Sequence, residues 1–481
     1  MEFSNVILII YVIILIIICL RIILNTTTPS KGLAYLLLIF SLPIVGIIFY
    51  LSVGLNYRKR KLYQKKIDID SKALPQLKEK SLYYTESLLR RHKAKLAIFY
   101  PLAQFLSNKH IISDNNDVKL LFNGEKTFPE ILKSLKLAKH HIHFEYYIYE
   151  NDIIGNEIAQ ILISKAREGV EVRFIYDDFG SKNIRSNIVK KLQKNGVEAY
   201  AFNKINFVQL ANRLNYRNHR KIIVIDGVIG YVGGINISDK YINPTKTNVY
   251  WRDTHLKIQG NAVFNLQYTF LTDWNFCSKQ NLGFSSDFFP IDEMKLKKGE
   301  ELVQIVSSGP DTDHPNIMYS LIQSILLAKK EILITTPYLI PNNSFLNALK
   351  IAALSNVSIK IIVPKVSDSI IVGVTTTSFF EELLEVGIKI YRYNKGFVHA
   401  KTMVCDELVS HVGTANLDNR SFELNFEINA IVFNEKTAKS LKIQFEKDLK
   451  DSKEVYLNNW KKRPFFRLLI EKILHLFSSL M

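Results

Sequence analysis

The chain has 481 residues, which is long enough for two or three domains with a large buried core. Its formal net charge of +18 at pH 7 predicts attraction to a polyanion, either nucleic acid or the acidic surface of a membrane. The three cysteines stand far apart, and the eleven histidines form no HExxH or Cys/His cluster. Composition therefore argues against a disulfide-stapled domain and against a cysteine-based metal site.

The first 57 residues are expected to form a transmembrane hairpin. An unbroken apolar run covers residues 6–20, and a second run without any charge covers residues 32–54. Because a bilayer core requires about 20 such residues, we expect spanning helices at about 4–24 and 33–54. Only a short polar loop separates the two runs, which favours an antiparallel pair of helices.

A basic run after the second apolar segment sets the expected orientation. Residues 58–66 contain six lysines and arginines, whereas the loop between the apolar runs contains Lys31 alone. The positive-inside rule then places both ends of the hairpin, and the rest of the chain, in the cytoplasm. The sequence thus predicts a multi-pass cell-membrane protein with two spans and cytoplasmic catalytic domains. Residues 58–115 are expected to be a basic juxtamembrane linker.

The remainder of the chain shows an internal duplication. Strand-like and helix-like segments alternate between residues 137 and 177, and they recur in the same order between 327 and 365. A repeat of this kind predicts an α/β fold built from two like domains. We expect the first domain at 116–300 and the second at 301–460.

Residues 461–481 form a basic, amphipathic segment. Arg467, Glu471 and His475 fall on one stripe at helical spacing, and apolar residues occupy the other face. The pattern predicts a C-terminal helix. Such a helix fits equally well against the protein core or at a membrane interface.

An eight-residue pattern occurs once in each repeat. His219–Asp226 reads HRKIIVID and His399–Asp406 reads HAKTMVCD, so both fit HxKxxxxD. Each histidine is followed 17 residues later by an asparagine in a glycine-rich turn, Asn236 in the first copy and Asn416 in the second. The duplication predicts that the two halves bring these motifs into one site. The predicted catalytic residues are His219, Lys221, Asp226, His399, Lys401 and Asp406.

This set of side chains suits the transfer of a phosphorus group without a metal. One imidazole can attack phosphorus and form a phospho-histidine, while the other protonates the leaving alkoxide and then deprotonates the incoming alcohol or water. The two lysines and the amides of Asn236 and Asn416 are expected to bind the phosphate oxygens. A covalent intermediate also permits one alcohol to replace another.

The histidines need carboxylates that fix their tautomers. Asp226 and Asp406 end the motifs, but seven residues of strand place each of them roughly 23 Å from its histidine. We expect these two to brace the motif through hydrogen bonds to nearby backbone. Better candidates for orienting the histidines are Asp253 and Glu427, which follow the histidines of their own repeats by 34 and 28 residues.

The paired motif resembles that of the phospholipase D superfamily, and nearly the whole chain is similar to the bacterial cardiolipin synthases of that superfamily. The likeness includes EYYIYENDIIG at 145–155, WRDTHLKIQG at 251–260 and GTANLDNRSFELNFE at 413–427. It implies two phospholipase D-like α/β domains packed with the active site between them and preceded by the transmembrane hairpin.

The resemblance also implies a reaction. One phosphatidylglycerol would give its phosphatidyl group to a histidine, glycerol would leave, and a second phosphatidylglycerol would accept the group to yield cardiolipin. It implies no metal and no cofactor. The expected partners are phosphatidylglycerol and other anionic membrane lipids, with no nucleic acid and no obligate protein partner.

Two other functions stay open at this point. The same site could serve a membrane-tethered phospholipase D, or a phosphodiesterase or nuclease that is drawn to nucleic acid by the +18 charge. A hairpin and an amphipathic tail are not required by such a nuclease. A non-catalytic lipid-binding scaffold is disfavoured by the two intact motifs.

Overall fold

The computed structural model describes residues 3–26, 29–53, 63, 66, 84–107, 110–204, 216–244, 249–283, 285–290 and 299–481. The basic residues 58–61 and Lys65 of the predicted linker lie outside this part of the chain.

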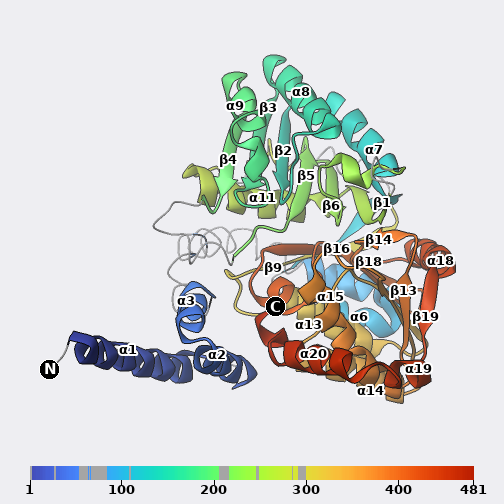
Figure 1. Cartoon of the computed structure of the whole chain (residues 1–481). Coiled ribbons are helices and arrows are strands. Elements are labelled where there is room, and N and C mark those ends of the chain that lie inside the picture. The colour runs from blue at the N-terminus through green and yellow to red at the C-terminus, as the bar shows by residue number, and fades with distance from the viewer. Residues whose placement is uncertain are drawn as a thin grey trace.

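One mixed sheet runs through the protein, and its two halves repeat each other (Figure 1). The strands follow the order β19-β13-β12-β10-β15-β16-β18-β9-β1-β8-β6-β5-β2-β3-β4. β1 and β9 pair antiparallel at the centre, and each strand outward from β1 has a counterpart at the same place outward from β9. This symmetry confirms the predicted duplicated α/β fold.

The strands of the first half are β1 (Ile112–Phe122), β2 (His141–Tyr146), β3 (Glu171–Asp177), β4 (Glu198–Phe202), β5 (Lys221–Ile225), β6 (Ile229–Gly233), β7 (Tyr250–Arg252) and β8 (Thr254–Gln259). Those of the second half are β9 (Glu301–Ser308), β10 (Glu331–Thr335), β11 (Leu339–Ile340), β12 (Ser358–Pro364), β13 (Lys389–Tyr393), β14 (Gly396–Val398), β15 (Thr402–Cys405), β16 (Val409–Gly413), β17 (Leu417–Asp418), β18 (Glu427–Phe433) and β19 (Ser452–Val455).

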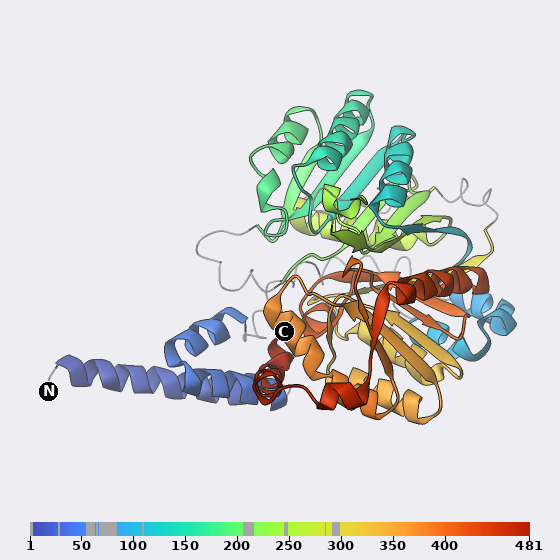
Figure 2. The same cartoon turned by 45° about the vertical axis from the view of Figure 1, so that its right-hand side comes forward.

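Helices cover both faces of the sheet (Figure 2). The first half contributes α7 (Gly124–Lys136), α8 (Ile153–Arg167), α9 (Ile188–Lys194) and α11 (Val263–Ser278). The second half contributes α13 (Asn316–Leu327), α14 (Asn343–Leu354), α15 (Ile370–Ser378), α16 (Phe380–Glu385), α17 (Asn419–Glu423), α18 (Glu435–Lys450), α19 (Leu457–Lys461) and α20 (Phe465–Leu476). The short helices α5 (Lys93–Leu96) and α6 (Tyr100–Phe105) precede β1.

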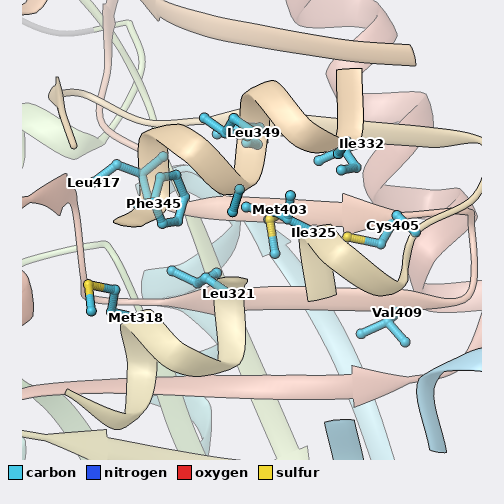
Figure 3. Packing of buried hydrophobic residues seen from close by; sticks show 14 of the residues in the cluster. Met318, Leu321, Ile325, Ile332, Phe345, Leu349, Met403, Cys405, Val409 and Leu417 are labelled. Atoms are coloured by element: carbon cyan, nitrogen blue, oxygen red, sulfur yellow. The ribbon is translucent and has the colours of Figure 1, made fainter. Parts of the chain in front are cut away.

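Central strands of this sheet are buried on both faces, which explains their continuous apolar sequences. β5 reads KIIVI and is buried at every position. In the second half, α13 and α14 bring Leu321, Ile325 and Leu349 against Met403 of β15, all within one buried cluster (Figure 3). β-branched residues favour strands of this kind, so the same sequence feature sets both the local structure and the core.

The N-terminal segment differs from the prediction. The second expected span is divided into α2 (Pro29–Ser41) and α3 (Pro43–Val53), of 13 and 11 residues. At 1.5 Å per residue these helices measure about 20 and 17 Å, less than the ~30 Å of a hydrocarbon core. Pro43 marks the break, and Gly46 lets α3 approach α2 so closely that a Cβ there would lie 2.6 Å from the Ile39 Cα.

α1 (Phe3–Asn25) precedes this pair. Within the residues that the structure describes, no helix has both the length and the hydrophobicity that crossing a bilayer demands. The predicted two-span hairpin is therefore wrong, and so is the multi-pass location that depended on it.

Candidate active site

The two motif histidines are held at equivalent places in the two halves. His219 lies just before β5, and His399 lies just before β15. The backbone N–H of each donates to a carbonyl of the other half: His219 to Phe426 at 2.9 Å, and His399 to Arg252 at 2.7 Å. The contact between halves is extended by the parallel pairing of β7 with β14. Each histidine is thus fixed by backbone from the opposite repeat.

Both histidines bind buried carboxylates, and the pairs cross between the halves. The Nδ1 of His219 lies 2.9 Å from Oε2 of Glu427, and the Nδ1 of His399 lies 2.7 Å from Oδ2 of Asp253. Both carboxylates are fully buried. The expectation that each carboxylate serves its own repeat is wrong, because β6 lies between β5 and β8, and β16 lies between β15 and β18. The two residues named by the sequence are still the ones that the structure brings to the imidazoles.

The two lysines lie beside the histidines. Lys221 Nζ donates to the His219 carbonyl at 2.7 Å, and Lys401 Nζ donates to the His399 carbonyl at 2.5 Å. Burial lowers the pKa of Lys221 to about 7 and that of Lys401 to about 8. The positive charges of Lys221 and Lys401 both help to lower the pKa of His219 and the pKa of His399. All four groups therefore belong to one electrostatic site.

Burial disfavours the protonated form of both imidazoles in the protein without bound lipid. Burial lowers the pKa of His219 to about 4, although the Glu427 carboxylate opposes the shift. Burial, and then Lys401 and Lys221, lower the pKa of His399 well below its ordinary value. A neutral imidazole has a free lone pair, which nucleophilic attack and general-base catalysis both require.

The two carboxylates differ in character. Burial raises the pKa of Asp253 to about 6. Burial also opposes the charge on Glu427, but His219 and other donors outweigh it and lower its pKa. One of these donors is the Thr414 hydroxyl, 2.5 Å from Glu427 Oε2. At the matching position of the first half stands Gly234, where a Cβ would lie 2.2 Å from Asp253 Oδ1. A side chain like that of Thr414 therefore has no room there.

Four aromatic residues line the histidines, and the sequence argument did not identify them; one is Phe397, whose ring lies 5.9 Å from the His399 ring. The Tyr147 ring lies 4.7 Å from the His219 ring, and Lys221 Nζ lies 5.3 Å from the same tyrosine ring. The rings of Tyr241 and Trp251 each lie 5.9 Å from the His399 ring. Tyr147 belongs to the string EYYIYEN and Trp251 to the string WRD, and of these residues only Asp253 was assigned a role from the sequence.

The two asparagines are near the site but are engaged differently. Asn236 Nδ2 donates to the Tyr241 hydroxyl at 2.9 Å, and its Oδ1 accepts the Ile148 N–H at 3.3 Å. Asn416 Oδ1 is buried and has no hydrogen-bond partner among the described residues. Phosphate binding by both amides remains a prediction, and Asn236 would have to share its donor with Tyr241.

Asp226 and Asp406 lie away from the imidazole pairs and bind backbone. Asp226 accepts the N–H groups of residues 139–141 at 2.8–2.9 Å. Asp406 accepts those of residues 329–331 at 2.7–2.8 Å. Each adopts a left-handed φ of 52–53°, which aspartate tolerates better than most residues. Each carboxylate thus ties the turn after its motif strand to the start of the neighbouring strand.

Replacing Asp226 with alanine should lower the free energy of unfolding by about 1–3 kcal/mol, because three backbone donors lose a charged acceptor. Urea titration of the purified full-length protein measures this loss. Asp226→Asn keeps one acceptor oxygen and should cost less. A stable Asp226→Ala protein without turnover would instead assign this carboxylate to the chemistry.

The rate should depend on pH through the lysines. A lysine is cationic below its pKa, so kcat/KM should fall as pH rises through about 7 to 8, the pKa values of Lys221 and Lys401 in the free protein. A bound phosphodiester is anionic and raises both values, so the decline of kcat should begin at higher pH. A pH–rate profile on a fixed lipid composition checks this. A kcat/KM that stays level to pH 9 would contradict the role of the lysines.

Both halves of the chain match known proteins. A family model described as "Cardiolipin synthase, PLD-like domain" matches residues 131–265 and 321–449, one match in each half. The chain is 41% identical to a cardiolipin synthase of Alkalihalophilus pseudofirmus, over 98% of this chain and 93% of that protein. It is 40% identical to cardiolipin synthase 2 of Bacillus anthracis, over 96% and 88%.

A solved structure shares the fold. The crystal structure of phosphatidylserine synthase from Haemophilus influenzae aligns with 79% of this chain and 99% of its own, with a TM-score of 0.59 and 14% identity. The sequence relatives cover nearly the entire chain, and both motifs lie in the matched regions. The chain therefore belongs to the cardiolipin synthase family of phospholipase D-like phosphatidyltransferases.

Proposed function

We propose that the site converts two phosphatidylglycerol molecules into cardiolipin and glycerol through a phospho-histidine. The observation that carries this proposal is the pair of buried imidazole–carboxylate contacts, at 2.9 and 2.7 Å, each of which joins one half to the other, with two lysines in the same electrostatic site. In this proposal residues 116–300 and 301–460 each supply one histidine and one lysine. The proposal requires neither nucleic acid nor a protein partner.

The first step breaks the bond between phosphorus and the glycerol oxygen. A neutral imidazole nitrogen of His219 attacks phosphorus and forms a P–N bond, while His399, which takes up a proton when the anionic phosphodiester binds, gives that proton to the departing glycerol oxygen. Glu427, whose pKa is lowered, stabilises the positive charge that develops on His219. We assign the nucleophile to His219 because its partner is the more strongly ionised carboxylate of the two.

The second step reverses the roles around the same phosphorus. His399, now neutral, removes the proton from the terminal hydroxyl of a second phosphatidylglycerol, and that oxygen displaces His219. The raised pKa of Asp253, about 6, suits a pair that passes a proton back and forth. Lys221 and Lys401 hold the phosphate oxygens in both steps.

Incubation with lipid and with DNA separates the candidate functions. Purified protein should convert phosphatidylglycerol vesicles into cardiolipin and an equal amount of glycerol, both measured by mass spectrometry, and should leave plasmid DNA intact. Phosphatidic acid in place of cardiolipin would indicate a phospholipase D. Cut plasmid would indicate a nuclease, and no product in either assay would indicate a scaffold.

Activity should survive excess EDTA, because two lysines and a protonated histidine supply the positive charge that the transition state needs. Turnover of phosphatidylglycerol vesicles before and after chelation measures this. A loss that is restored by added magnesium would contradict the proposed use of lysine and histidine alone.

A further inference from the structure

The C-terminal helix α20 is docked on the protein by its polar face. Glu471 is fully buried and accepts hydrogen bonds from the Thr377 hydroxyl at 3.0 Å and from Arg463 Nε at 2.8 Å. The Nδ1 of His475 lies 3.0 Å from the Ser378 hydroxyl oxygen. Thr377 and Ser378 belong to α15. The polar face of α20, which in most surface helices faces water, therefore packs against protein here.

The apolar face of α20 is consequently exposed. Six of its eight large apolar side chains are exposed, with exposed fractions between 43% and 77%. They are Phe465, Phe466, Leu469, Ile470, Ile473 and Leu476. An exposed apolar stripe of this extent marks a surface that meets another apolar phase.

A groove of about 600 Å³ runs between α15 and α20. Three cations line it, Lys365, Arg392 and Arg467, and none of the lining residues is an aspartate or a glutamate. Arg392 donates to the Lys365 carbonyl at 2.6 Å. Burial, and then the charge of Arg467, lower the pKa of Arg392, a repulsion that a bound anion would relieve.

The entrance of the groove is apolar. Ile370 is 86% exposed and Phe466 is 77% exposed, and both line the groove together with Ile470. Three cations and exposed apolar side chains that line the same groove match a molecule with an anionic head and hydrocarbon chains. Such a helix, with basic and apolar groups separated, is typical of one that lies in the plane of a membrane interface.

The neighbouring helix α2 extends the same surface. A second cavity of about 510 Å³ is lined by Leu33 and Leu37 of α2 and by Leu476 of α20. Leu33 is 67% exposed. Figures 1 and 2 both show α2 and α20 along the side of the molecule that is opposite the first half of the sheet. The exposed apolar residues therefore gather on one face.

We propose that the groove between α15 and α20 binds the headgroup of an anionic phospholipid of a bilayer while the apolar face of α20 lies among the acyl chains. The lipid held there is distinct from the one that reacts, since neither motif histidine lines the groove. The groove gives the enzyme a second contact with its lipid surface. This contact rests on the proposed function, which requires a surface that contains anionic lipid.

Tryptophan fluorescence in the full-length protein tests this placement. In Phe466→Trp, vesicles of phosphatidylcholine and phosphatidylglycerol with brominated acyl chains should quench the introduced indole at least twofold more than they quench the unsubstituted protein. Ile443→Trp is the matched control, because Ile443 is 54% exposed on α18, away from α20 in both views. Equal quenching of both variants would overturn the proposal.

The headgroup contact has its own test. Vesicles of brominated phosphatidylcholine alone should quench Phe466→Trp less than the vesicles that also contain phosphatidylglycerol. In the double variant Phe466→Trp, Arg392→Gln, the two vesicle types should quench equally. Equal quenching with and without anionic lipid would show an apolar contact only and would overturn the headgroup site. Arg392→Gln should retain turnover of short-chain phosphatidylglycerol in detergent within about twofold. Loss of that turnover in the unsubstituted protein as well would be a failure of the proposed reaction, not of the groove.

Discussion

Replacing either motif histidine with alanine should reduce turnover by at least about 10³-fold while the protein stays folded. His219 and His399 perform different steps, as nucleophile and as proton carrier, and general acid–base catalysis alone contributes about 10²–10⁴-fold. Release of glycerol from phosphatidylglycerol vesicles measures the rate. His314→Ala is the matched control, because this exposed histidine lies outside the site, and it should leave the rate unchanged.

The covalent intermediate distinguishes the two histidines. His399→Ala should still accept a slow, acid-labile phosphatidyl label from radiolabelled lipid, whereas His219→Ala should accept none. Labelling in the reverse pattern would exchange the two roles. A loss of only a few-fold in either variant would contradict a single shared site.

The second large effect concerns the carboxylates. Asp253→Asn and Glu427→Gln should each slow turnover by about 10²–10⁴-fold, because the amide no longer stabilises the imidazolium or fixes the tautomer. Asp287→Asn and Glu446→Gln change exposed carboxylates in the same way and should have no such effect. Thermal unfolding should show that all four proteins are folded.

The crossed arrangement predicts which imidazole each substitution affects. In histidine-labelled protein, Asp253→Asn should shift the NMR titration of His399 and leave that of His219 in place. Glu427→Gln should do the converse. Shifts confined to the histidine of the same repeat would contradict the contacts at 2.7 and 2.9 Å.

Much of the fold could be predicted from local pattern. β5 and β15 are short runs of β-branched and other apolar residues that follow a polar pair, so their strand conformation and burial follow from the sequence. The duplication is visible because the same elements recur in the same order. The bracing role of Asp226 and Asp406 also followed from strand geometry alone, and their backbone hydrogen bonds agree with it.

The pairing of carboxylates with histidines could not be predicted, because it depends on the order of strands in the sheet and on the contact between the halves. Sequence separation suggested Asp253 for His219, but the intervening strand β6 keeps these two apart. The error at residues 33–54 is of another kind. Pro43 and Gly46 mark the break in the sequence, but the prediction rested on the number of uncharged residues alone.

The crossed pairs also bear on how such a chain can change over time. The histidine of each repeat is oriented by a carboxylate of the other repeat, so a substitution at Glu427 affects His219, 208 positions away in the sequence. The central pairing of β1 with β9 has the form of a contact between two identical subunits related by a two-fold axis. A single ancestral repeat would have oriented its histidine only by associating with a second copy of itself. In the present chain the two halves differ, as Gly234 and Thr414 do, and each histidine still depends on a carboxylate of the other half.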